Sequence, residues 1–183
     1  SVCFFSIFCL CSLLLHSQSW IDLTEAYITN PHFDTNSTQG WIYTSDASNQ
    51  AGGYGGWEFW NGSFNIYKTI TVPNGKYRIS AQAYYRTTDN KEAYENYCNG
   101  TEEITAFLYA NDSRCPVASI YSEHLDEDYA QNCWKTRDEN GVAIYFPNGM
   151  QSGSHCFTQG MYMNSVETEV TNGTLTLGIV NDN

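Results

Sequence analysis

The residues best suited to chemistry are aromatic side chains placed between glycines. The stretch GGYGGWEFW, residues 52–60, holds four large rings and four glycines. The glycines around Tyr54 and before Trp57 supply no side chains that would bury these rings, and they give the backbone unusual freedom. An exposed ring can stack on the apolar face of a sugar. We therefore expect Tyr54 and Trp57 to form part of a ligand-binding surface, with burial of both rings as the alternative.

A second candidate surface lies on residues 77–86, where apolar and polar side chains alternate. Gln82, Tyr84 and Arg86 share the parity opposite to the apolar residues, so they lie on one face of a predicted strand. A ring beside an amide and a guanidinium can stack on a sugar and hydrogen-bond its hydroxyls. We expect these three residues to bind ligand, with an ordinary solvated sheet face as the alternative.

The sequence carries none of the common catalytic signatures that we sought. It lacks the HExxH and GxSxG motifs and a phosphate-binding glycine–lysine loop. An acidic run lies at residues 123–128, but glycosidase carboxylates must face each other across a sugar, and sequence spacing does not show this. We therefore predict no catalytic residue and a binding protein rather than an enzyme.

The charge of the chain argues against two classes of partner. The net charge is −12, with only eight Lys and Arg residues. Such a surface repels both the phosphate backbone of nucleic acids and anionic lipid. We expect neither as a partner.

The first residues of the sequence are typical of an export signal. Residues 2–15 are almost entirely apolar and uncharged, and small residues follow at Ser17 and Ser19. We predict a signal peptide at residues 1–19 and a single binding domain at residues 20–183, secreted or held at the cell surface. No membrane insertion is expected once the signal has been removed. The alternative for residues 2–15 is a buried helix.

Four cysteines lie outside the predicted signal: Cys98, Cys115, Cys133 and Cys156. An even number in an exported chain allows two disulfides, with three connectivities. Cys98 and Cys133 lie in predicted long loops, so a bond between them would restrain the least ordered backbone. We expect this bond together with Cys115–Cys156, and free buried thiols are the alternative.

Much of the remaining sequence alternates with the period of β-strands. Turn residues stand at 73–75 and at 172–173. They predict two hairpins, residues 64–72 with 77–85 and residues 166–170 with 175–179. Four aromatic residues are expected in the core: Phe33, Trp41, Phe59 and Phe64.

Short strands at this spacing predict an all-β fold, an antiparallel β-sandwich of the jelly-roll type. We expect one short helix within residues 148–159 and two long loops at residues 87–103 and 123–141. Because the sequence ends directly after a predicted strand, we expect the last strand of the sandwich to lie beyond Asn183.

The stretch ITNPHFDTNSTQGW, residues 28–41, carries a family resemblance. Its Asn30, its Phe33-Asp34 pair and its Gly40-Trp41 pair resemble the opening of galactose-binding-like jelly-roll carbohydrate-binding modules of bacterial secreted glycan-processing proteins. The blocks EFWNGSFNIYKTITVPNGKYRISAQAYYR and NGTLTLGIVNDN are similar to later parts of the same pattern. The resemblance implies a two-sheet antiparallel sandwich and a glycan as ligand.

The resemblance also implies a structural Ca²⁺ in many such modules, held by an acid of the opening motif and by an acid of the last strand. Asp34 is the one matching residue here, so the site would be incomplete in this chain, since Ca²⁺ takes six to eight oxygen ligands.

Together these observations favour a non-catalytic carbohydrate-binding module of an exported protein, with further domains attached in the full-length protein. The alternative is a structural or protein-interaction sandwich of a larger cell-surface protein. A glycoside hydrolase is the third and least favoured function.

Overall fold

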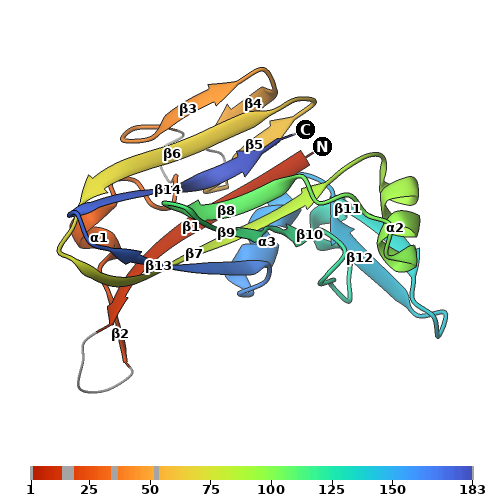
Figure 1. Cartoon of the computed structure of the whole chain (residues 1–183). Helices are drawn as coiled ribbons and strands as arrows, with labels where there is room; N and C mark the ends of the chain where they lie inside the picture. Colours follow the sequence, from red (N-terminus) through yellow and green to blue (C-terminus); the bar gives the residue numbers. More distant parts are fainter. Residues whose placement is uncertain (1, 14–18, 34–36, 52–53, 183) are drawn as a thin grey trace.

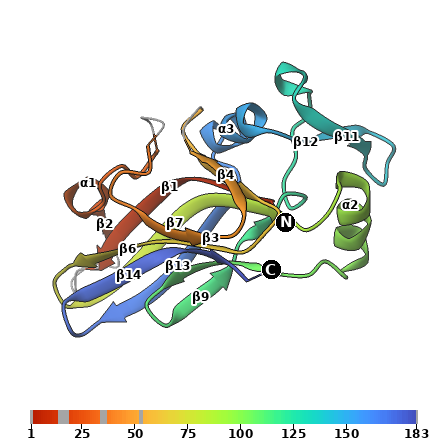
Figure 2. The same ribbon diagram turned by 90° about the horizontal axis from the view of Figure 1, so that it is seen from above.

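The computed structural model describes residues 2–13, 19–33, 37–51 and 54–182. Two sheets pack face to face and a smaller two-stranded ribbon lies beside them (Figure 1); all described strand pairs are antiparallel except β10 (Ala118–Ser119) with β7 (Gly75–Arg86) in the larger sheet. The predicted all-β sandwich is confirmed. Figure 2 shows the ribbon and the longer helices gathered at one end and on one side of the sandwich.

The smaller of the two packed sheets has five strands. Its order is β3-β6-β14-β8-β9, and every neighbouring pair is antiparallel. The strands span Ile42–Ser45 (β3), Phe64–Thr71 (β6), Thr174–Asn181 (β14), Ala106–Ala110 (β8) and Ser113–Pro116 (β9).

The larger sheet has seven strands, with β7 at its centre. Strand β7 (Gly75–Arg86) pairs with β1 on one side and with β13 and β10 on the other. The remaining members are, with their bounds, β1 (Val2–Leu13), β2 (Trp20–Asp22), β4 (Ser48–Ala51), β5 (Trp57–Trp60), β10 (Ala118–Ser119) and β13 (Met163–Val170). In the full chain, part of the predicted signal segment thus forms a strand between β5 and β7. Its removal on export stays a prediction.

The inner faces of the two sheets form one hydrophobic core. Strand alternation builds it, because successive side chains of each strand point to opposite faces. All four aromatic residues expected there are buried, and the Phe59 and Phe64 rings stack with centroids 4.1 Å apart across the two sheets. Each buried ring of this kind removes roughly 150–250 Å² from water, so this cluster is a main source of stability.

The two predicted hairpins are wrong. Strand β6 pairs with β14, and β7 pairs with β13, so both turns carry the chain from one sheet to the other. The two corners lie side by side: the Asn74 amide donates to the Thr171 carbonyl at 2.9 Å and accepts from the Gly173 amide at 2.9 Å. Alternation and turn residues predicted the strands correctly, but they do not specify which strands pair.

The two predicted long loops contain regular structure. The first holds helix α2 (Asn90–Asn99), which begins at the N-cap Asp89 and ends at Gly100 in the left-handed conformation. The second holds a 3₁₀ turn, η1 (Tyr129–Gln131), and the whole of strand β11 (Cys133–Arg137), which pairs with β12 (Ala143–Pro147).

The predicted short helix is present as α3 (Met150–Thr158), and a one-turn helix α1 (Thr24–Tyr27) follows β2. The described residues therefore contain three α-helices, where we had expected one. Helices α2 and α3 and the ribbon share a second hydrophobic cluster that also includes Tyr84 of β7.

Candidate functional site

The glycine-rich stretch presents only one of its two candidate rings. Tyr54 is 59% exposed and has a positive φ. The other ring, Trp57, is 0% exposed. It is the first residue of β5, its side chain points into the core, and it packs against Phe33 and Phe59. The expectation that Trp57 lies exposed is wrong: the glycines before it do not prevent the opposite sheet from covering its ring.

The candidate residues of β7 are mostly covered as well. Gln82 is buried and its amide donates to the carbonyl oxygens of Phe157 (2.7 Å) and Met161 (3.0 Å), at the end of α3. Tyr84 is buried beside the Phe157 and Tyr162 rings. The expectation of a ligand-facing surface here is therefore wrong for Gln82 and Tyr84, because α3 lies on that face.

Arg86, the third candidate on β7, is half-buried at the end of the strand. One guanidinium nitrogen, Nη1, donates to the side chains of Asn90 and Asn148, the latter at 3.1 Å. Tyr121 lies beside it, and burial raises the pKa of this phenol. The guanidinium thus joins the start of α2 to the start of α3, which is a structural role.

The predicted metal ligand Asp34 lies outside the described residues. In the part of the chain that the structure describes, no group of three or more His, Cys, Asp and Glu residues is arranged to hold a metal ion. Calcium binding stays a prediction that rests on the resemblance alone.

The outer face of the five-stranded sheet carries a row of residues that sequence reasoning did not select, two of them tyrosines. Strand register places Ile42, Tyr67, Gly178, Tyr109 and Arg114 side by side across the five strands. All have the parity opposite to the core, so they lie on one surface. We call this set the aromatic row.

Gly178 allows the two tyrosines of the aromatic row to approach each other. A Cβ atom added there would lie 2.2 Å from the Ile66 carbonyl oxygen, 2.9 Å from the Tyr109 hydroxyl and 2.9 Å from Tyr67 Cβ. The Tyr109 ring therefore reaches over β14, and its hydroxyl bonds to Asn65 Oδ1 on β6 at 2.9 Å. Burial raises the pKa of Tyr109, the Asn65 bond opposes this shift, and Tyr67 adds to it. At neutral pH the Tyr109 hydroxyl keeps its proton and donates a hydrogen bond to Asn65 Oδ1.

The neighbouring register row leads into a hollow. Thr44, Asn65, Val180 and Phe107 are aligned on β3, β6, β14 and β8, and the Arg114 guanidinium lies over the Phe107 ring at 4.4 Å. A hollow of about 420 Å³ opens where these strands end, a volume at the lower end of the range for ligand pockets. Its lining consists of Thr44, Ser45, Asp46, Ser63, Phe64, Asn65, Val180, Asn181 and Asp182.

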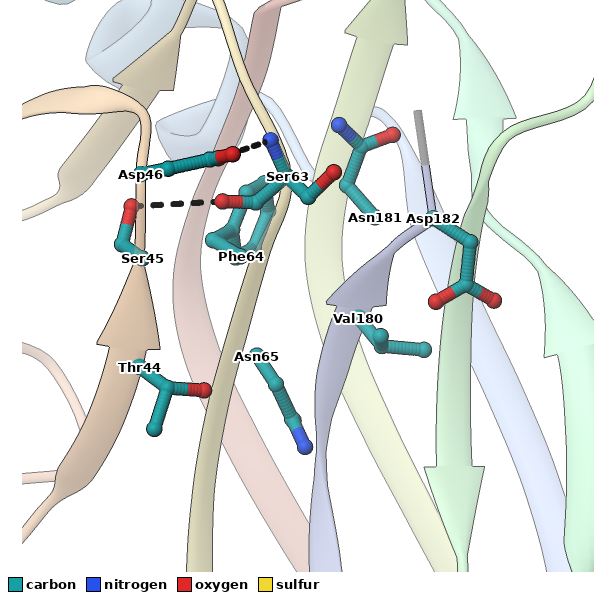
Figure 3. Close-up of a pocket in the computed structure, with 9 residues that line it drawn as sticks. All are labelled: Thr44, Ser45, Asp46, Ser63, Phe64, Asn65, Val180, Asn181 and Asp182. Carbon is teal, nitrogen blue, oxygen red and sulfur yellow. Dashed lines mark hydrogen bonds between the residues drawn. The ribbon is translucent and has the colours of Figure 1, made fainter.

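Polar groups of the hollow are held in place by the backbone. The Ser63 amide donates to Asp46 Oδ1 at 2.6 Å, and the Ser45 hydroxyl donates to the Ser63 carbonyl at 3.4 Å (Figure 3). The buried Asn181 amide donates to the Gly62 carbonyl at 3.0 Å. Figure 3 shows Asp46 and Asp182 on opposite sides of the hollow. The lining offers carboxylate, amide and hydroxyl groups, and it contains no Lys or Arg.

A sequence signal for this face existed. In residues 64–72, the parity opposite to the core includes Asn65, Tyr67 and Thr69, which together offer a ring, an amide and a hydroxyl. That pattern is similar to Gln82, Tyr84 and Arg86 on the next strand, and only the three-dimensional arrangement separates the two: helix α3 lies over one set and away from the other (Figure 2).

Comparisons of the chain with protein-family models, curated proteins and solved structures give no match. Among the described residues, every helix is too short or too polar to cross a bilayer. Any function must therefore be argued from the geometry itself.

Proposed function

We propose that this chain is a non-catalytic glycan-binding module of an exported protein, and that the sugar docks on the outer face of its five-stranded sheet. The observation that carries the proposal is the pairing of Tyr67 and Tyr109 across Gly178, next to a polar hollow. Sugars combine apolar C–H faces with hydroxyls, so they need rings and hydrogen-bonding groups on adjacent patches.

Each part of this face has a role in the proposed complex. The half-buried Tyr67 and Tyr109 rings supply apolar surface, and the Asn65 bond fixes the orientation of the Tyr109 ring before the ligand arrives. In the hollow, Asp46 and Asp182 accept hydrogen bonds from sugar hydroxyls, and Thr44 both donates and accepts. A surface fixed in advance loses less entropy on binding.

The charge of the hollow favours a neutral sugar. Two carboxylates line it and no cation does, in a chain whose net charge is −12. A uronic acid or a sulfated sugar would be repelled, whereas a neutral hexose or pentose chain would not. We expect weak affinity for a single module, because the rings are few and the hollow is shallow.

A glycan array followed by titration tests the proposal. We expect signals from neutral glycans, and Tyr67→Ala is expected to weaken binding roughly tenfold by removing a stacking ring. Tyr97→Ala, a substitution of an exposed tyrosine on α2, is the matched control and leaves the affinity unchanged.

Three other outcomes would count against the proposal. Loss of binding in Tyr54→Ala with none in Tyr67→Ala would move the site to the glycine-rich loop. Silence across plant, host and microbial glycans would favour a structural or protein-interaction module. Release of a sugar product would make the protein a hydrolase.

A further inference from the structure

Helix α3 and the start of β11 are joined by an unusually close set of contacts. The Ser152 hydroxyl bonds to the Asn132 carbonyl at 2.6 Å and to Asn132 Oδ1 at 2.9 Å, and the Ser152 amide donates to the same Oδ1 at 3.2 Å. The Asn148 amide donates to the Asn132 carbonyl at 3.1 Å. The Tyr129 and His155 rings stack at 3.7 Å one turn further along the helix. The segment 129–133 is therefore fixed along one side of α3.

Two cysteines lie at this junction. Cys133 directly follows Asn132, and its thiol lies beside the Ser152 hydroxyl and 3.9 Å from the Tyr129 carbonyl oxygen. Cys156 stands four residues after Ser152 in α3, so the two share a helix face, where positions i and i+4 are roughly 5–6 Å apart. Cys133 therefore lies beside the helix face that carries Cys156, and it contributes to the raised pKa of Cys156.

The other two cysteines lie elsewhere. Cys98 is exposed near the end of α2, and Cys115 lies in β9 of the five-stranded sheet, where its sulfur is near the Ser165 backbone. Cys98, Cys115, Cys133 and Cys156 are all free thiols in this structure.

We propose that Cys133 and Cys156 form a disulfide when the protein meets a disulfide oxidant, which fastens α3 and the β11–β12 ribbon to each other. In this reaction the Cys133 thiolate, the less buried of the two, attacks a small-molecule disulfide and releases one thiolate from it. Cys156 then gives up its proton, attacks the Cys133 sulfur of the mixed disulfide, and releases the second thiolate. The two cysteines lose two electrons and two protons, and the oxidant is reduced to two thiols.

The bond is structural rather than catalytic. Burial is the main cause of the raised pKa of both thiols, to about 12 for Cys156, so neither resembles the acidic thiol of a redox enzyme. The proposed bond differs from the two bonds that the sequence alone suggested, Cys98–Cys133 and Cys115–Cys156.

Peptide mapping of the full chain after incubation with oxidised glutathione tests this assignment. Trypsin together with a glutamate-specific protease cleaves after Glu103, Arg114, Glu123, Glu127 and Lys135, so Cys98, Cys115, Cys133 and Cys156 fall in different peptides. We expect a linked pair that contains Cys133 and Cys156. The Tm of the oxidised protein should exceed that of the reduced protein by roughly 5–10 °C.

The variants separate a disulfide from general packing effects. Cys133→Ser is expected to remove both the linked peptide and the Tm difference between the oxidised and reduced protein, and Cys156→Ala should do the same. Cys98→Ser is the matched control and keeps both. Free Cys133 and Cys156 thiols after oxidation, or a link from either of them to another cysteine, would overturn the assignment.

Discussion

The two outer faces of this sandwich begin from the same sequence pattern and end in opposite environments. On β6 the outward parity carries Asn65, Tyr67 and Thr69, and on β7 it carries Gln82 and Tyr84. The β7 face is closed by α3 and the residues that follow it, and the Phe157 and Met161 carbonyls there accept both hydrogen bonds from Gln82. The β6 face remains open, with Ile42 beside it 54% exposed. The same residue types are therefore structural on one sheet and available to a ligand on the other.

The difference is produced by an insertion between strands of the sandwich. Residues 87–103 and 120–162 form α2, the β11–β12 ribbon and α3, which build their own hydrophobic cluster on top of Tyr84. No comparable segment lies on either side of β6 or directly before β14, where the described connections are short. Where a chain inserts its extra elements thus decides which sheet face can bind.

The largest effect is expected on the covered face. Phe157→Ala would remove a buried ring that packs against Tyr84, and should lower the free energy of unfolding by roughly 3–5 kcal/mol. Denaturant unfolding measures this loss. A loss below about 1 kcal/mol would mean that α3 packs only weakly on β7. Gln82 and Tyr84 would then again be candidates for ligand binding.

A smaller effect is expected on the open face. Gly178→Ala places a methyl group against the Ile66 carbonyl and the Tyr109 ring, and we expect it to cost roughly 1–3 kcal/mol of stability and to reduce glycan binding as the ring moves. Gly75→Ala is the matched control, since its nearest neighbour lies at 3.9 Å. Equal effects of the two substitutions would mean that the missing side chain at Gly178 does not position the Tyr109 ring.

The smallest effect concerns pH and the covered cluster. Burial, with added repulsion from Cys133 and Glu123, raises the pKa of Cys156 from its ordinary value of 9.0 to about 12. The folded state therefore keeps a proton that the unfolded state loses, so this stabilisation is present below about pH 9 and declines as the pH rises towards 12. Between pH 9 and 10 the free energy of unfolding of the reduced protein should fall by on the order of 1 kcal/mol through this group.

Chemical unfolding in reductant at several pH values measures that slope. Cys156→Ala should make it shallower by the part that this thiol contributes. If Cys156→Ala keeps the wild-type slope, Cys156 does not titrate differently in the folded and unfolded states.

Sequence patterns specified most of the sandwich but not its connections. Parity identified the core-facing residues of β6 and β7, with one charged residue among them. Lys68 has core parity, and the structure buries it with its Nζ donating to the Thr29 carbonyl at 3.1 Å and lying over the Trp41 ring. What local patterns do not contain is the choice of partner strand, so both predicted hairpins became corners between sheets.

The candidate site was harder to predict, for a related reason. Whether Trp57 or Tyr84 is exposed depends on which distant segment covers it, and neither glycine neighbours nor strand parity records that. Arg86 shows the same effect, because its partners Asn90 and Asn148 are far apart in the sequence. Tyr67 and Tyr109 become neighbours only because β14 brings Gly178 between them.

Chemical-shift mapping during titration with a neutral oligosaccharide selected from the array tests the central claim most directly. The account predicts that the shifted backbone amides cluster on β6, β14 and β8, around Tyr67, Gly178 and Tyr109, and extend into the hollow at Asp46 and Asp182. Shifts gathered on the glycine-rich loop at Tyr54 or on α3 and the ribbon, with the outer face of the five-stranded sheet unchanged, would contradict it.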